Sequence, residues 1–125
     1  GERDGLPWVT TAHVGDASLR DELRRHGGRR PDARALAWRQ LWFVQTCRAA
    51  AALHARGLLP LDLDPGNLWL AADGGSVCLD AAFAPPVRWR ESVLEPADVQ
   101  TLAWLWVELV AGRAAFRADR HAALA

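Results

Sequence analysis

Four residue types are missing from this chain of 125 residues, namely lysine, methionine, isoleucine and tyrosine. Arginine supplies all 15 basic residues, and 15 acidic residues bring the formal net charge to zero. A neutral chain has no bulk charge to attract nucleic acid or a membrane surface, so neither is expected as a partner. We interpret the bias toward arginine and alanine as genomic base composition. The missing initiator methionine predicts a processed chain or a piece of a longer one.

Cysteines, metal-ligand patterns and long apolar runs are scarce as well. Cys47 and Cys78 are too few and too isolated for a disulfide framework, which predicts a reducing, cytoplasmic location. The four histidines have no ligand spacing with one another or with the cysteines, so neither zinc nor haem is expected. No apolar run approaches the roughly 18 residues that cross a bilayer, so we expect no membrane span and no signal peptide.

The chain does contain enough apolar surface for one folded domain. Hydrophobic residues make up 50% of it, and its length suits a single unit over residues 1–125. Residues 8–14, WVTTAHV, are rich in β-branched types and predict a short strand. Residues 18–57 predict two helices, the first capped by Ser18 with Asp21 three positions later.

The second of these helices is the longest segment of the chain. It is expected to open at Pro31–Asp32 and to run to about Arg56. Apolar residues recur along it at spacings near three and four, which predicts a well-buried helix. Leu41, Trp42 and Val44 belong to this stripe, Trp38 is expected in the core, and Arg39 and Arg48 are among the polar positions.

The second half of the chain predicts a hairpin followed by a buried helix. Residues 58–80 contain a tight polar loop, an apolar run, a glycine turn and a second apolar run. Residues 81–97 contain prolines without a clear period, which predicts an extended segment. Residues 98–112 are almost continuously apolar, as in a helix surrounded by protein. We therefore expect a mainly α fold with a small β-hairpin.

The polar loop before the hairpin carries the residues best suited to chemistry. Asp62, Asp64 and Asn67 gather around a tight turn, and their carboxylate and amide oxygens suit a hard cation such as magnesium or calcium. The same residue types are the commonest in plain turns, so a turn without chemistry is one alternative. A calcium loop is another, because Asp62, Asp64 and Asp73 fall at its first, third and twelfth positions, although a proline interrupts it.

Three stretches of the chain are similar, in the same order, to segments of a known family. The first reads LHARGLLPLDLDPGNLWL followed by VCLDAA, and it resembles the catalytic loop and metal-binding segment of the protein kinase family. The kinase hinge strand and the short helix after it resemble WVTTAHVGDASLRDELRR, and the buried helix of the large lobe resembles DVQTLAWLWVELVAGRAAF. The resemblance implies a truncated kinase-like C-terminal lobe, with residues 81–97 as a shortened activation segment and the N-terminal lobe absent.

The resemblance also implies catalytic roles for individual residues. Asp62 would orient the substrate hydroxyl and accept its proton, with Asn67 as its catalytic neighbour. Asn67 and Asp80 would hold magnesium on the nucleotide phosphates, so ATP and Mg²⁺ are the implied cofactors. Phosphoryl transfer depends on such positioning and charge neutralisation more than on covalent chemistry.

Further residues receive supporting roles from the same resemblance. Asp98 would be structural, tethering the catalytic loop through backbone hydrogen bonds from the start of the buried helix. His54 matches a Leu-His pair at a helix end and would also be structural. Backbone groups of Ala12, His13 and Val14 would face the adenine of a bound nucleotide.

The departures from the kinase pattern weaken the case for activity. The lysine expected two residues after Asp62 is Asp64, which places an anion next to the phosphates. The His-Arg pair before Asp62 is Pro60-Leu61, and the Phe-Gly pair after Asp80 is Ala81-Ala82. There is no glycine-rich nucleotide loop, and a chain without lysine cannot supply the strand lysine that holds phosphates.

These residues favour a degenerate kinase-like domain that acts as a regulatory or protein-binding module and is inactive as an isolated chain. Its expected partners are another protein or the missing N-terminal lobe, and exposed apolar surface would allow self-association. The alternative is the large-lobe part of an active ATP- and Mg-dependent serine/threonine kinase or related phosphotransferase, completed by that missing lobe. A small-molecule kinase of the aminoglycoside phosphotransferase type is a narrower version of this alternative.

Overall fold

The computed structural model describes residues 2–3, 5–7, 12–27, 29–60, 63–79 and 94–112. The elements in chain order are β1 (Glu2–Arg3), β2 (Leu6–Pro7), β3 (Ala17–Ser18), α1 (Leu19–Arg25), α2 (Ala33–His54), the 3₁₀ turn η1 (Pro65–Asn67), β4 (Leu68–Leu70), β5 (Val77–Leu79) and α3 (Leu94–Ala111). The predicted class, mainly α with a small β-hairpin, is confirmed. No described helix combines the length and apolar character that a membrane crossing requires.

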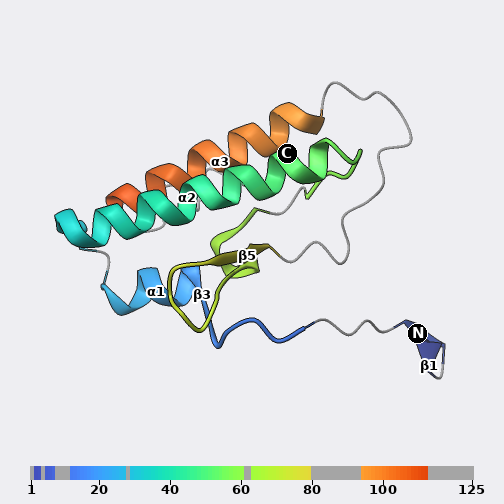
Figure 1. The fold of residues 1–125 in the computed structure, drawn as a ribbon, viewed down its shortest axis with the longest axis horizontal. Helices are drawn as coiled ribbons and strands as arrows, with labels where there is room; N and C mark the ends of the chain where they lie inside the picture. The colour runs from blue at the N-terminus through green and yellow to red at the C-terminus, as the bar shows by residue number, and fades with distance from the viewer. Residues whose placement is uncertain are drawn as a thin grey trace.

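Two layers make up the body of the fold. Helices α2 and α3 lie side by side and run in opposite directions, and α1 and the small sheet lie beneath them (Figure 1). The sheet has the antiparallel order β3-β4-β5, with Trp69 opposite both Ser18 and Cys78. The hairpin of β4 and β5 thus gains a third strand, β3, and the sequence did not indicate this pairing.

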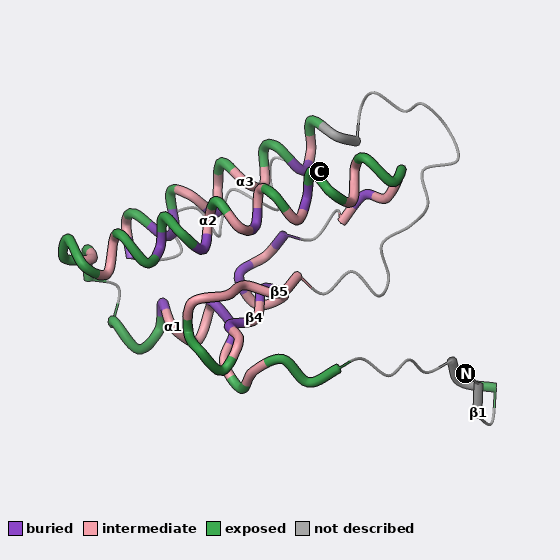
Figure 2. The backbone as a smooth tube through the Cα atoms, in the orientation of Figure 1, coloured by how far each residue is buried: buried purple, intermediate pink, exposed green. Residues whose placement is uncertain are grey.

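The apolar core lies where the two layers meet. Figure 2 shows buried residues on the facing sides of α2, α3 and the sheet, with exposed residues on the outer helix faces. Burying these side chains removes apolar surface from water, which is the main favourable contribution to folding. The buried cluster consists of Leu19, Leu23, Trp42, Leu68, Leu70, Leu105 and Leu109.

The segment before α1 differs from the prediction. Residues 12–14, within the predicted strand 8–14, have no regular structure, and residues 8–11 lie outside the described residues. The strand forms instead at Ala17–Ser18, directly before the helix. The chain approaches β4 closely here, because a Cβ built on Gly15 would lie only 1.7 Å from the carbonyl oxygen of Leu70. Pairing with β4, not β-propensity, fixes where the strand forms.

Helix α1 begins at the predicted cap. The Asp21 backbone N–H donates to the Ser18 hydroxyl oxygen at 3.2 Å, and the Ser18 backbone N–H donates to an Asp21 carboxylate oxygen at 3.0 Å. These two reciprocal bonds form a capping box and satisfy two backbone donors at the helix start. The interaction with Ser18 lowers the pKa of Asp21 below its usual value.

Helix α2 matches its predicted bounds to within two residues but buries a narrower face than expected. Asp32 caps its start by accepting from the Ala35 backbone N–H at 2.8 Å. Trp42 is buried, whereas Leu41 and Val44, expected in the buried stripe, are 43% and 42% exposed. Trp38, expected in the core, is exposed as well. The described structure covers only one side of this helix, where α3 and the sheet lie.

Helix α3 begins at Leu94, four residues before the predicted start at Asp98. Pro96 falls in its first turn, where a missing backbone N–H leaves no intrahelical bond unmade. Leu105 and Leu109 are fully buried against the core, but Val99 on the same helix is 61% exposed, so the prediction of a helix surrounded by protein is wrong for the described structure. The last four residues predicted as an extended segment, 94–97, are therefore helical, and residues 81–93 lie outside the described residues.

Candidate functional site

The polar loop folds into a single 3₁₀ turn that leads into β4. Asp64 caps this turn, because its carboxylate oxygen accepts from the Gly66 backbone N–H at 2.8 Å. The Asn67 backbone N–H donates to the Asp64 carbonyl oxygen at 2.8 Å. Leu63 and Pro65 are buried and anchor the turn to the core. The turn predicted from these residue types is present, and local hydrogen bonds hold it.

An ion pair that the sequence did not reveal joins this turn to α1. The Arg20 guanidinium donates to the Asp64 carboxylate, and both side chains are less than one-third exposed. We expected Asp64 to present an anion toward a nucleotide. In the structure its charge is neutralised by Arg20, and its oxygen also caps the turn, so the carboxylate serves the fold.

The predicted catalytic and metal residues are only partly described. Asn67 is half-buried at the end of the 3₁₀ turn, and Asp62 and Asp80 lie outside the described residues. Within the described part, no group of three histidine, cysteine or acidic side chains could hold a metal ion. Asn67 is thus the one described member of the implied magnesium set, and the described residues by themselves do not complete a site for Mg²⁺.

His54 and Asp98 meet at the junction of α2 and α3. The His54 ring nitrogen Nε2 lies 2.7 Å from Asp98 Oδ2, and the Asp98 side chain is 1% exposed. The second carboxylate oxygen of Asp98 has no hydrogen-bond partner among the described residues. The described contact joins Asp98 to a side chain at the end of α2. The expected backbone bonds from Asp98 to the catalytic loop stay a prediction, because residues 61 and 62 of that loop lie outside the described residues. A buried carboxylate with this partner links the two long helices.

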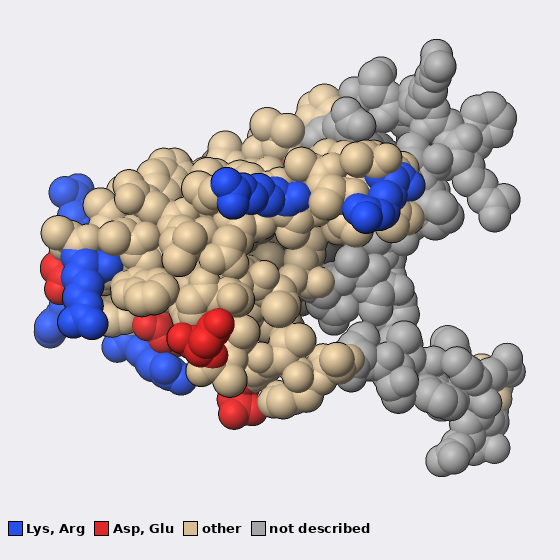
Figure 3. All heavy atoms as spheres, in the orientation of Figure 1, with Lys and Arg blue, Asp and Glu red and all other residues tan. Residues whose placement is uncertain are grey.

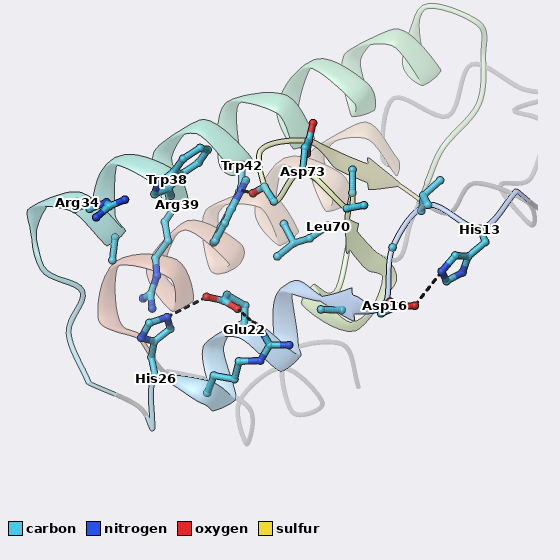
Figure 4. A pocket seen from close by; sticks show the side chains of 18 of the residues that line it. His13, Asp16, Glu22, His26, Arg34, Trp38, Arg39, Trp42, Leu70 and Asp73 are labelled. Atoms are coloured by element: carbon cyan, nitrogen blue, oxygen red, sulfur yellow. Dashed lines mark hydrogen bonds and ion pairs between the residues drawn. The ribbon is translucent and has the colours of Figure 1, made fainter.

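Two of the three residues predicted to face adenine, His13 and Val14, line a cavity. Ala12, His13 and Val14 are exposed, and His13 Nε2 lies 3.0 Å from an Asp16 carboxylate oxygen. His13 and Val14 form one wall of a cavity of about 840 Å³ between α1, α2 and the β4–β5 turn (Figure 4). Neither Asp64 nor Asn67 lines it. The adenine contact stays a prediction, and this cavity is separate from the polar loop.

The β4–β5 turn closes this cavity and is fixed by α2. The Trp42 indole N–H donates to the Gly74 carbonyl at 3.0 Å, and the Gln45 side-chain amide donates to the Gly75 carbonyl at 2.7 Å. Asp73 accepts from the backbone N–H groups of Gly75 and Ser76, and the bond from Gly75 is the main reason that the pKa of Asp73 lies below its usual value. Asp73 therefore acts in the turn, as turn chemistry predicts, with no calcium loop required.

Arg39 is the polar residue that sequence reasoning misplaced. We expected it among the exposed positions of α2, but it is 1% exposed. Its Nη1 donates to the Leu109 carbonyl oxygen at 2.7 Å, near the C-terminal end of α3. The sequence spacing could have indicated this burial, because Arg39, Trp42 and Thr46 recur at helical intervals on the buried face of α2.

Comparison with known proteins gives one partial match. The chain is 33% identical over 107 residues to "Probable serine/threonine-protein kinase PkwA" of Thermomonospora curvata. The matched stretch covers 85% of this chain but only 14% of the length of that protein. No family model and no solved structure matches the chain. The match indicates a distant kinase-like relationship for this stretch.

Proposed function

We propose that this chain is a degenerate protein kinase-like C-terminal lobe that works as a regulatory or protein-binding module. The observation that carries the proposal is the Arg20–Asp64 ion pair. Asp64 stands where the kinase pattern requires a lysine that is free to reach a phosphate, and it forms a structural contact with Arg20. A carboxylate that caps a turn and pairs with a guanidinium gives a nucleotide no cation at that position.

The kinase-like ancestry is supported by the partial match to a protein described as a probable serine/threonine kinase. It is supported further by the order of elements, with a short helix, a long helix, a polar turn, a hairpin and a second long helix. Because the chain spans 14% of that relative, activity and partners of the whole relative do not carry over directly.

A protein-binding role is supported by apolar side chains on the outer faces of the long helices. Val99 on α3 is 61% exposed, and Val107 and Val110 on the same helix are exposed too. On α2 the indole of Trp38 and the side chains of Leu41 and Val44 are also exposed. Scattered apolar side chains are ordinary on a surface, but this many on two adjacent helices suit a contact surface.

The alternative is the large-lobe part of an active ATP- and Mg-dependent kinase completed by a separate N-terminal lobe. It is favoured by Asn67, which keeps its place directly after the Asp-Pro-Gly turn, and by the name of the matched relative. In this alternative Asn67 and Asp80 would bind Mg²⁺, which would neutralise charge on the transferred phosphate.

The two proposals differ in whether ATP with Mg²⁺ stabilises the folded chain. Any ligand that binds only the folded state raises the melting temperature with its concentration. We expect no saturable, Mg-dependent rise for the wild type, and sedimentation velocity on the same samples should show reversible self-association. A rise that saturates, needs Mg²⁺ and disappears in Asn67→Ala but not in the exposed control Arg48→Gln would replace the proposal with the alternative.

A further inference from the structure

A second site is indicated at the end of the molecule where α1 connects to α2, and it begins with Arg39. This arginine is buried, and its Nη1 is used by the Leu109 carbonyl at 2.7 Å. Its other terminal nitrogen, Nη2, is buried and has no hydrogen-bond partner among the described residues. Arg39 also forms no ion pair with any described carboxylate. A buried guanidinium without an anion is costly, and the cost is relieved when an anion binds.

Arg39 lies in the wall of a cavity of about 530 Å³, here called the basic cavity. Four arginines and one aspartate line it, which gives a net charge of +3 with His26 neutral. Figure 4 shows the Arg39 side chain extending from α2 toward His26 and Glu22 of α1, and Figure 3 shows arginines gathered at this end of the molecule. The charged lining residues are Arg25, Arg29, Arg30, Arg39 and Asp32.

The nearby carboxylates are already used by other groups. Glu22 accepts from Arg25 at 3.3 Å and lies 3.0 Å from the His26 ring nitrogen. Asp32 accepts from the Ala35 backbone N–H at the start of α2. Burial lowers the pKa of Arg39, and Glu22 and Asp32 oppose this from a distance without forming a bond to it. Glu22 thus compensates Arg25, whereas Arg29, Arg30 and Arg39 form no ion pair with a described carboxylate.

The wall that carries the outer arginines is held against α3. A Cβ built on Gly112, at the end of α3, would lie 1.9 Å from the Arg29 carbonyl oxygen. The backbone at Arg29 therefore packs directly against the end of that helix, and only glycine fits there. Arg39 reaches the same helix end through the Leu109 carbonyl. The end of α3 thus fixes both Arg39, the floor of the cavity, and the backbone of Arg29, part of its rim. This common support favours a preorganised site.

We propose that the basic cavity binds an oxyanion of the phosphate class, with Arg39 Nη2 as the buried donor and Arg29 and Arg30 as rim cations. A guanidinium presents donors in a planar fork that suits a phosphate, and charge-assisted bonds of this kind are the strong ones. The N-terminus of α2 opens beside the cavity and adds a favourable dipole. Asp64 and Asn67 are not among the lining residues, so the site does not depend on the proposed function.

The test is a calorimetric titration of the full chain with sodium phosphate at constant ionic strength, balanced with sodium chloride. The double variant Arg29→Gln, Arg30→Gln removes the rim charges, and neither side chain has a described partner that holds the fold. Its control is Arg48→Gln, Arg56→Gln, which makes the same charge change on α2 and the residues after it, away from the cavity, and removes only the exposed bond from Arg56 to the Ala52 carbonyl. O-phosphoserine serves as a second titrant, to separate free phosphate from a phosphate ester.

We expect saturable binding by the wild type, about ten-fold weaker binding by the rim double variant, and unchanged binding by the control. Tighter binding of O-phosphoserine would assign the site to a phosphate ester, and tighter binding of phosphate would assign it to the free ion. Equal losses in both double variants would mean diffuse charge attraction and would overturn the proposal, as would the absence of saturable binding.

The buried donor is tested separately with Arg39→Lys. Lysine keeps the charge but lacks the planar fork, so binding should weaken while the circular dichroism spectrum stays that of a folded chain. If this variant unfolds, the rim variant and its control still decide the question. A folded Arg39→Lys variant with unchanged affinity would remove Arg39 from the site and contradict the proposal.

Discussion

Arg20 and Arg39 use the same functional group in opposite ways. Arg20 pairs with Asp64, so its charge is compensated at a partly exposed position next to the polar loop. Arg39 is fully buried, and its one described hydrogen bond goes to the neutral Leu109 carbonyl. The first arginine holds a turn in place, and the second holds the end of a helix while one nitrogen stays available.

The contrast shows that position decides what an arginine can still bind. At the polar loop, to which the kinase resemblance directs attention, the charge of Arg20 is already paired with Asp64. Our proposed function rests on this pairing. Uncompensated charge at the far end of the fold favours an anion where the resemblance predicts nothing. Three changes, ordered by expected effect on stability, test whether this contrast is real.

The largest effect is expected from Arg39→Ala. It removes a buried side chain and leaves the Leu109 carbonyl without its donor, which should cost about 3 kcal/mol of unfolding free energy. Arg39→Met fills most of the same space without a charge and should cost about 1 kcal/mol. Urea unfolding followed by circular dichroism measures both. Equal costs for the two variants would show that packing does not matter at this position.

An intermediate effect is expected from the Arg20–Asp64 pair. Arg20→Gln and Asp64→Asn each remove the ion pair while keeping groups that can form hydrogen bonds, and each should cost about 1 kcal/mol. The double variant should reveal a coupling energy of about 0.5–1 kcal/mol in a thermodynamic cycle. Additive costs would mean that the two charges act independently. The Asp64 carboxylate would then not be stabilised by its contact with Arg20.

The smallest effect is expected from Asp21, a carboxylate held by hydrogen bonds without an arginine partner in contact. Its pKa lies below the usual 3.8, mainly because the Ser18 backbone N–H donates to it. The charged form therefore stabilises the fold above pH 3.8, and this contribution is lost as the pH falls through the lowered folded-state pKa.

Asp21→Asn should lower the unfolding free energy near neutral pH and flatten its decline below pH 3.8. Thermal melts across that range measure the slope, and Asp16→Asn, an exposed change outside the capping box, is the control. An unchanged slope in Asp21→Asn would assign the acid sensitivity of the fold to other carboxylates.

Much of the fold was predictable because its determinants are local. The caps at Ser18 and Asp32 and the turn at Asp64 each act through bonds that span only a few residues. The start of α3 was misplaced because Pro96 suggested a boundary, although proline is tolerated in a first helical turn. The strand before α1 was misplaced because its position depends on β4, more than 50 residues later.

The candidate site was predictable only in its residue types. The sequence indicated Asp64 and Asn67 as chemically capable, but the partner of Asp64 lies 44 residues away on α1. Arg39 looked like a surface residue, since its hydrogen bond reaches Leu109, 70 residues later. Contacts over such separations are set by how helices pack, and no periodicity in one helix reveals them.

The sequence by itself determined the elements, the caps and the polar turn of this protein, because hydrogen bonds between near neighbours and apolar periodicity depend on local order. Only the tertiary structure decided which charges are compensated. The antiparallel packing of α2 against α3 buries Arg39 beside a helix end, and the packing of α1 against the turn brings Arg20 to Asp64. Electrostatic roles depend on distance and burial, and both are properties of the folded chain.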